Sequence, residues 1–276
     1  MDLQGKTVLI TGSSDGLGKE VALLAARAGA TVLLHGRSRA KSEPVLDEVR
    51  AAGSKDAELY LADLSSLEDV RRLAEEVSAR HRRLDVLLNN AGVALFGGEP
   101  RQLTADGREL HFQVNYLSHF LLTRRLLPLL EAATPARIVN VSSLGQAPVD
   151  FEDVMLEHGY SGERGYCQSK LAQIMFTFDL SEQLKGSGVT VTALHPGTFM
   201  NTKMVTDAGF APRSKLEDGA AATYRLAASP EVEGQTGVFY NQLSLGRAND
   251  QAYDVKARRE LWNLSLRLAG LQAAAV

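Results

Sequence analysis

Residues 7 to 29 read TVLITGSSDGLGKEVALLAARAG. A short apolar run leads through a glycine-rich turn into a segment whose apolar residues recur at helical spacing. In such a unit Gly12 permits the tight turn, Gly16 lets the backbone approach a pyrophosphate, and Gly18 lets the helix pack closely on the strand. The stretch predicts a dinucleotide-binding βα unit, although a glycine-rich turn that binds no ligand has the same pattern.

The same alternation continues along the chain. Helical patterns separate further apolar runs at 31–35, 58–62, 85–89, 137–142, 189–195 and 237–240. Continuous apolar strands between helices imply a parallel sheet that is covered on both faces. We therefore expect a doubly wound, Rossmann-type α/β fold. The chain has no linker or repeat, so residues 1–276 are read as a single domain.

Composition excludes several classes of protein. A net charge of -3 over 276 residues gives no basic field for nucleic acid. One cysteine excludes an intramolecular disulfide and fits a reducing compartment, and six scattered histidines show no metal-binding spacing. The N-terminus has no signal-peptide pattern, and no apolar run is long enough to span a membrane. We expect a cytoplasmic protein without a metal ion.

Four short motifs occur in a fixed order. They are the glycine-rich turn at 11–18, NNAG at 89–92, VNVSS at 139–143, and Tyr166 with Lys170. With this combination the chain resembles the short-chain dehydrogenase/reductase family over nearly its entire length. The segments HFLLT (119–123), RIVNVSS (137–143) and YCQSKLA (166–172) resemble its retinol-dehydrogenase-like branch, and in part the protochlorophyllide reductases.

The resemblance implies roles for four residues. Tyr166 matches the family's proton-donating tyrosine, and Lys170 matches the lysine that also holds the nicotinamide ribose. Ser143, the second serine of its pair, matches the serine that polarises the substrate oxygen. Asn115 matches the asparagine that anchors a water between the lysine and solvent.

The spacing of Tyr166 and Lys170 supports their assignment separately. Residues four apart share one face of a helix, so the phenol and the ammonium point to one site. A free tyrosine has a pKa of about 10, which a nearby cation lowers towards neutrality. Without the other motifs, an exposed pair on a helix would be the better interpretation of this spacing. Cys167 is turned about 100° around the helix from Tyr166, and we expect it to be a small packed thiol.

The end of the second expected strand selects the cofactor. Enzymes that prefer NAD carry an acidic residue there for the ribose 2′-hydroxyl. This chain has Arg37 in that place and Ser38 beside it, which favours the 2′-phosphate of NADP. A solvated basic turn would have the same pattern. Asp63 matches the family position over the adenine, and a helix cap with Ser65 would also explain it.

The resemblance extends to the remaining cofactor contacts. The residues expected to contact NADP(H) are Gly12, Ser14, Gly16, Leu17, Gly18, Arg37, Ser38, Asp63, Leu64, Asn90, Ala91, Gly92, Tyr166, Lys170, Pro196, Gly197, Phe199 and Thr202. Four residues separate Gly197 from Thr202, one more than is usual, so a contact of Thr202 with the nicotinamide carboxamide stays open. Phe199 either packs on the nicotinamide or is a loop hydrophobe.

Two segments are expected to form the substrate walls, because both follow strands at the ligand-binding edge. The first is an acidic insert at about 145–164, longer than the family's usual connection, and the second is the loop at about 198–216. Acidic residues disfavour an anionic substrate. Apolar side chains in the two segments favour a neutral, fairly apolar one, unless they pack the loops on the body. These side chains are Met155, Leu156, Phe199, Met200, Met204 and Phe210.

The sequence therefore predicts an NADP-dependent oxidoreductase that moves hydride between the nicotinamide and a carbonyl or alcohol. The alternative is a non-enzymatic NADP(H)-binding sensor, against which the complete set of Asn115, Ser143, Tyr166 and Lys170 argues. We also expect a homodimer or homotetramer. The apolar residues of 106–131 and of the helix that begins near Tyr166 exceed what one buried face requires.

Overall fold

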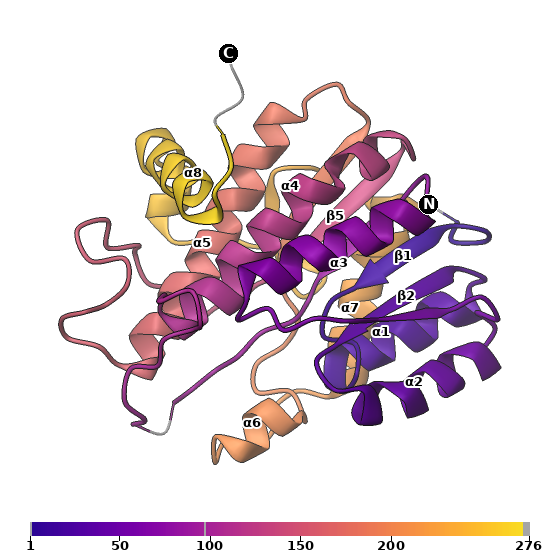
Figure 1. The fold of residues 1–276 in the computed structure, drawn as a ribbon, viewed down its shortest axis with the longest axis horizontal. Helices are drawn as coiled ribbons and strands as arrows, with labels where there is room; N and C mark the ends of the chain where they lie inside the picture. The colour runs from indigo at the N-terminus through magenta and orange to yellow at the C-terminus, as the bar shows by residue number, and fades with distance from the viewer. Residues whose placement is uncertain (1, 97, 273–276) are drawn as a thin grey trace.

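The computed structural model describes residues 2–96 and 98–272. Within them eight strands form one sheet in the order β3-β2-β1-β4-β5-β6-β7-β8, part of which is labelled in Figure 1. The strands are β1 (Thr7–Ile10), β2 (Thr31–Gly36), β3 (Glu58–Leu61), β4 (Val86–Asn89), β5 (Ala136–Val141), β6 (Val189–His195), β7 (Val238–Asn241) and β8 (Ser244–Leu245). Only the pair β7 and β8 is antiparallel. The expected doubly wound, single-domain α/β fold is confirmed.

Helices cover both faces of the sheet. Alternate residues of a strand point to opposite faces; in β1, Leu9 packs with one layer of helices and Val8 with the other. The first layer contains α3 (Leu67–Arg80), α4 (Ser118–Glu131), α5 (Gly162–Gln183) and α8 (Val255–Ala269), and the second contains α1 (Gly16–Arg27), α2 (Arg39–Ala51) and α7 (Leu216–Ala228). Figure 1 shows the two layers. Burial on both faces explains the continuous apolar strands.

The segment before α4 is less regular than its sequence predicts. Helical periodicity indicates a helix from Asp106, but residues 106–108 form a turn, and Leu103 bridges to Glu109 instead. Helical structure begins at residue 110 and passes through a π-helical turn, η1 (Phe112–Leu117), before α4. Such turns often occur at functional sites, and this one contains Asn115.

Helix α8 covers the outer surface of α4 and α5. The ring of Trp262 lies 5.1 Å from that of Phe120 and 6.0 Å from that of Phe176. The Tyr116 hydroxyl is hydrogen-bonded to Ser265 Oγ at 2.6 Å. The apolar surplus of α4 and α5, which suggested a homodimer or homotetramer, is thus buried within the chain and does not by itself require a second copy.

The middle of the insert at 145–164 packs on the body of the protein. Val149, Val154 and Leu156 are buried. Gln168 Nε2 donates to the Val154 carbonyl at 2.9 Å, and Arg101 Nε donates to the Met155 carbonyl at 2.7 Å.

The remaining elements are short. They are α6 (Lys203–Asp207) and the 3₁₀ turns η2 (Pro230–Val232) and η3 (Asp250–Tyr253). Among the residues that the structure describes, no helix combines the length and apolar character needed to cross a membrane.

Candidate active site

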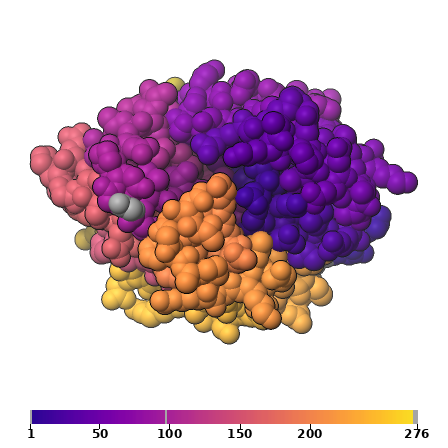
Figure 2. All heavy atoms as spheres, turned by 90° about the horizontal axis from the view of Figure 1, so that it is seen from below, coloured from indigo at the N-terminus to yellow at the C-terminus, as the bar shows by residue number. Residues whose placement is uncertain are grey.

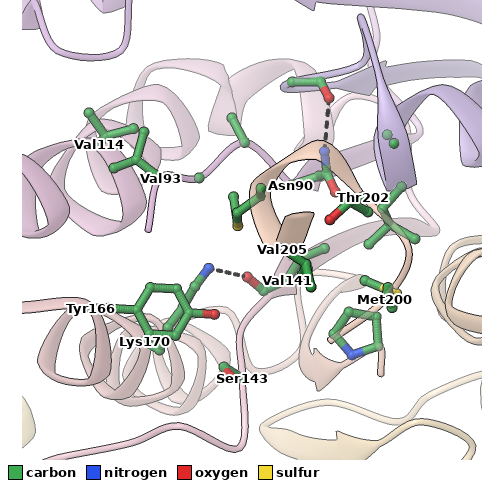
Figure 3. Close-up of a pocket in the computed structure, with 18 of the residues that line it drawn as sticks. Asn90, Val93, Val114, Val141, Ser143, Tyr166, Lys170, Met200, Thr202 and Val205 are labelled. Atoms are coloured by element: carbon green, nitrogen blue, oxygen red, sulfur yellow. Dashed lines mark hydrogen bonds between the residues drawn. The ribbon is translucent and has the colours of Figure 1, made fainter. Parts of the chain in front are cut away.

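One cavity of about 1000 Å³ opens at the carboxyl ends of the parallel strands. The loops after β1 to β6 line it, and so does the segment around α6. Figure 2 shows the segment around α6, in orange, lying against the first part of the chain, in indigo. Figure 3 shows residues of the cavity wall. This is where ligands bind in doubly wound folds.

Three glycines shape one end of the cavity through their backbones; we call it the cofactor end because the sequence predicts NADP(H) there. Gly12 has φ +65°, and a Cβ there would lie 2.8 Å from the Ala91 Cα. Gly16 has φ +53° and is the first residue of α1. The side chain of Asp15 accepts a hydrogen bond from the Gly16 amide. A Cβ on Gly18 would lie 2.6 Å from Asn90 Nδ2. A side chain would therefore be strained or would clash at each position.

The Thr11 hydroxyl joins this turn to the NNAG motif. It accepts from the amides of Asn90 and Ala91, at 2.9 and 3.0 Å, and lies 3.0 Å from His119 Nε2. The side chain of Asn90 donates to the Thr11 carbonyl at 2.8 Å. Gly92 lies beside Asn115 and Lys170, because a Cβ there would lie 3.2 Å from Asn115 Oδ1 and 3.6 Å from Lys170 Nζ.

His35 joins the ends of β1, β2 and β3 beside the glycine turn. Its Nδ1 accepts from the Gly12 amide at 3.0 Å, so Nε2 carries the proton and donates to the Ala62 carbonyl at 3.1 Å. Burial lowers the pKa of His35 to about 4. The imidazole is therefore neutral at neutral pH.

The basic residues after β2 divide into two kinds. Arg37 is exposed and lines the cavity, whereas Arg39 forms an ion pair with Glu43 at 2.9 Å. Asp63 also lines the cavity, while its Oδ1 accepts from the Ser65 amide at 2.9 Å. This contact is local to the turn, since the N-cap of α3 is Ser66, and Asp63 faces the cavity.

Ser143, Tyr166 and Lys170 meet at the other end of the cavity (Figure 3). The Lys170 ammonium lies 5.6 Å from the centre of the Tyr166 ring and donates to the Val141 carbonyl at 2.9 Å. The neighbouring Ser142 has a different role, since its hydroxyl donates to the Lys170 carbonyl at 2.7 Å. It fixes α5 to the end of β5.

Burial is the main cause of the pKa shifts of both Lys170 and Tyr166. It lowers the pKa of Lys170 to about 7. It also raises the pKa of Tyr166, which a hydrogen bond with Ser143 lowers to a smaller extent. The expectation that Lys170 brings the tyrosine pKa below its usual value therefore does not describe the balance found here. A lysine that titrates near neutrality carries only part of its charge at neutral pH, and its effect on the phenol is correspondingly weak.

Asn115 is fully buried and does not line the cavity. Its side chain accepts from the Val93 amide at 2.7 Å and donates to the Val93 carbonyl at 3.0 Å and to Ser169 Oγ at 2.9 Å. Its own carbonyl lies 3.0 Å from His119 Nδ1. These contacts fix the segment after β4 against α5.

His195 joins the loops after β5 and β6. Its Nδ1 accepts from the Leu144 amide at 3.3 Å, and its Nε2 lies 3.1 Å from Thr198 Oγ1. Burial, with a smaller contribution from Lys170, lowers the pKa of His195 to about 4. A neutral imidazole therefore holds the loop of Ser143 beside the loop that follows β6.

Aromatic rings line the end of the cavity near Tyr166, which we call the substrate end because the sequence predicts the substrate there. The ring of Phe96 lies edge-on to that of Tyr166, with centroids 5.1 Å apart, and 5.6 Å from that of Phe210. Phe210 stacks on Phe199 at 4.6 Å, and the guanidinium of Arg213 lies over the Phe199 ring. Phe199 has φ +47°, a strained conformation for a residue with a side chain.

The insert contributes little to this wall. Of residues 145–164 only Gly145 and Glu163 line the cavity. Met155 instead packs on the core and Leu156 is fully buried, whereas Met200, Met204 and Phe210 of the second segment do line the cavity. Cys167 lines it too, with a thiol whose pKa burial raises to about 11. Such a thiol is a poor nucleophile.

Eighteen of the twenty residues expected at the site line this one cavity, and Asn115 and Ser38 do not. Thr202 lies beside Gly16, since a Cβ there would be 3.4 Å from its methyl group. Sequence reasoning missed Phe96, His35 and His195. Their signal was weak: two histidines at strand ends and one phenylalanine in a loop.

Comparison with known proteins agrees with this geometry. The short chain dehydrogenase family model matches residues 6–210. Human retinol dehydrogenase 13 is 37% identical, over 99% of this chain and 87% of its own length. The solved structure of an uncharacterized protein from Mycobacterium paratuberculosis is 34% identical, with a TM-score of 0.79, over 98% of this chain and 97% of its own. A short chain dehydrogenase from Escherichia coli CFT073, solved with NADPH, is 27% identical, with a TM-score of 0.71, over 87% of this chain and 98% of its own.

The fold and the cavity define a Rossmann-type oxidoreductase. Within that class, the chain belongs to the short-chain dehydrogenase/reductase family, in its retinol-dehydrogenase-like branch.

Proposed function

We propose that this protein is an NADP-dependent oxidoreductase that interconverts a carbonyl compound and an alcohol. One observation carries the proposal: a single cavity joins the glycine turn and Arg37 at one end to Ser143, Tyr166 and Lys170 at the other. NADP(H) would lie along the cavity, held by the glycine turn, Arg37 and Lys170, and would supply or accept the hydride.

The side chains of the site would supply the proton that the carbonyl oxygen takes up during reduction. Ser143 and Tyr166 would hydrogen-bond the carbonyl oxygen, and Tyr166 would transfer its phenolic proton to that oxygen during reduction. Lys170, with its pKa near 7, can exchange a proton at neutral pH and would return the phenolate to the phenol. Asn115 contributes through its scaffold contacts with Val93 and Ser169.

Arg37 supports NADP over NAD. Its guanidinium is exposed at the cavity, and the described residues offer it no ion pair, unlike Arg39. A 2′-phosphate would meet a charge that is free to bind it, and no carboxylate follows β2 directly to repel it.

The substrate end supports a neutral and fairly apolar substrate. Phe96, Phe199, Phe210 and Met204 line it, and Glu163 would repel an anion. The relatives are named for retinol, which is itself a neutral, largely apolar alcohol. Retinoids therefore belong among the compounds to test.

A panel of carbonyl compounds and alcohols, with NADPH or NADP⁺ followed at the nicotinamide absorbance, tests the proposal. We expect turnover with neutral apolar members, retinoids included. The proposed substrate class is contradicted if the best substrates carry several negative charges. An NADP(H)-binding sensor would bind the cofactor and turn over no member, an outcome against which the intact Ser143, Tyr166 and Lys170 site argues.

Two further proposals concern the compartment and the assembly of the protein. A reducing compartment such as the cytoplasm rests on the single cysteine. A homodimer or homotetramer would need a surface other than the part of α4 and α5 that α8 covers, and the mass in solution at micromolar concentration decides between these and a monomer.

A further inference from the structure

The segment 93–96, which follows β4, is held against the π-helical turn η1 at two points. At the first, the side chain of Asn115 bonds both the amide and the carbonyl of Val93. At the second, four residues earlier and directly before η1, His111 Nε2 accepts from the Leu95 amide at 3.0 Å. Figure 3 shows Val93 beside Val114 of η1.

His111 is oriented in turn by Glu109. Both side chains are 0% exposed, and His111 Nδ1 lies 2.7 Å from Glu109 Oε1. Because the Leu95 amide donates to Nε2, the imidazole proton is on Nδ1 and faces the carboxylate. The other carboxylate oxygen accepts from the Phe112 amide at 2.7 Å. We call Glu109 and His111 the buried pair.

The first turn of α5 packs directly on the buried pair. A Cβ on Gly165 would lie 2.9 Å from His111 Nδ1 and 3.1 Å from Glu109 Oε1. A Cβ on Gly162 would overlap the Leu95 carbonyl. The two glycines therefore bring the start of α5, and Tyr166 with it, against both the pair and the segment 93–96. The positive end of the helix also favours the Glu109 charge.

The residue after Leu95 meets the reacting tyrosine. The ring of Phe96 lies edge-on to the Tyr166 ring at 5.1 Å, and the His111 ring lies 6.5 Å from it at 87°. Neither Glu109 nor His111 lines the cavity. The buried pair therefore reaches the reaction only through Leu95, Phe96 and the position of Tyr166.

We propose that Glu109 and His111 are positioning residues, which set the Phe96 ring against Tyr166 and so hold the phenol in its reactive orientation. The inference rests on the proposed function, because positioning is measured through turnover. If the pair had a purely structural role, replacing either nitrogen of His111 would lower stability in the same way. A positioning role predicts a difference between the two nitrogens, because only Nε2 accepts the hydrogen bond from Leu95.

Two substitutions of His111 separate the two nitrogens. His111→Gln can place its amide oxygen where Nε2 lies and keep the bond from Leu95. His111→Asn is shorter; it can keep a donor towards Glu109 and loses the acceptor for Leu95. The measurements are kcat with the best carbonyl substrate, the Kd for NADPH, the melting temperature, and hydrogen exchange at the Leu95 amide.

We expect His111→Asn to lower kcat about ten-fold, because small misplacements of a reacting group are costly. Exchange at Leu95 should quicken, and the Kd for NADPH should stay near that of wild type, because the pair lies away from the glycine turn. His111→Gln should restore kcat and slow exchange. Wild-type kcat in His111→Asn, or an equal loss of kcat in both variants at matched melting temperature, overturns the inference. If the wild type turns over no carbonyl compound, the proposed function has failed; equal Leu95 exchange in the two variants then still rejects the bond.

Discussion

The two ends of the cavity are built differently. At the cofactor end, Gly12, Gly16 and Gly18 hold the wall by backbone geometry, and a side chain would be strained or would clash at each. At the substrate end the wall consists of side chains from loops far apart in sequence, such as Phe96 and Phe210. A fixed backbone suits a cofactor shared by many enzymes, whereas loop side chains can vary with the substrate.

The largest effect is expected at Tyr166, the proposed proton donor at the substrate end. Tyr166→Phe removes the proton donor and leaves the glycine turn intact, so turnover should fall about a thousand-fold. The Kd for NADPH should not change. Cys167→Ser, one residue away, is the control and should stay within a few-fold of wild type. Near-normal turnover in Tyr166→Phe would mean that another group supplies the proton.

The next effect tests the backbone of the cofactor end. Gly18→Ala places a Cβ 2.6 Å from Asn90 Nδ2 and closer still to the Gly12 carbonyl. We expect the Kd for NADPH, followed by nicotinamide fluorescence, to rise about a hundred-fold, or about 2.7 kcal/mol. Gly246→Ala is the control, since its nearest contacts are 3.2 Å away and it does not line the cavity. An unchanged Kd in Gly18→Ala would show that the turn yields easily.

Acid should lower the stability of the folded protein, because each end of the cavity contains a buried histidine. Burial lowers the pKa values of His35 and His195 in the folded protein to about 4, from the usual value of about 6.5 for a free histidine. The unfolded chain therefore binds these protons first, and stability should fall as the pH drops from about 6.5 towards 4. The contribution between pH 7 and pH 5 is about 2 kcal/mol for each histidine.

Urea unfolding at pH 7 and pH 5 measures this loss. His35→Gln should make the decrease in unfolding free energy smaller by about 2 kcal/mol, because the group no longer titrates. His158→Gln, at an exposed histidine, should leave the decrease unchanged. If His35→Gln shows the full wild-type decrease, the neutral imidazole beneath the glycine turn is not the source.

The smallest effect concerns the choice of cofactor. The wild type should bind NADPH at least ten-fold tighter than NADH, a difference of about 1.4 kcal/mol. Arg37→Asp should abolish that preference, and Arg39→Asp should keep it, because Arg39 is paired with Glu43 away from the cavity. Equal affinities of the wild type for NADPH and NADH would reject the assignment of Arg37.

The difference between the two ends also explains what the sequence could predict. The strands were found from continuous apolar runs, and the cofactor end from glycines whose spacing is set by the turn itself. The antiparallel β8, two residues long, has no apolar run to indicate it. Acidic residues lie between two buried residues of the insert, Val149 and Val154, so the sequence did not indicate that the middle of the insert packs on the body. The contact of Phe96 with Tyr166 depends on a fold that brings residues 70 apart in sequence together, which local patterns do not show.

Transfer of a labelled hydride tests the central claim most directly. The wild type would be given NADPH that carries deuterium at C4 of the nicotinamide, in either configuration, with the best carbonyl compound of the panel. The account predicts that deuterium from one of the two configurations appears on the former carbonyl carbon of the alcohol, as mass spectrometry would show. Alcohol formed without deuterium from either configuration, or no alcohol while NADPH binds tightly, would contradict it.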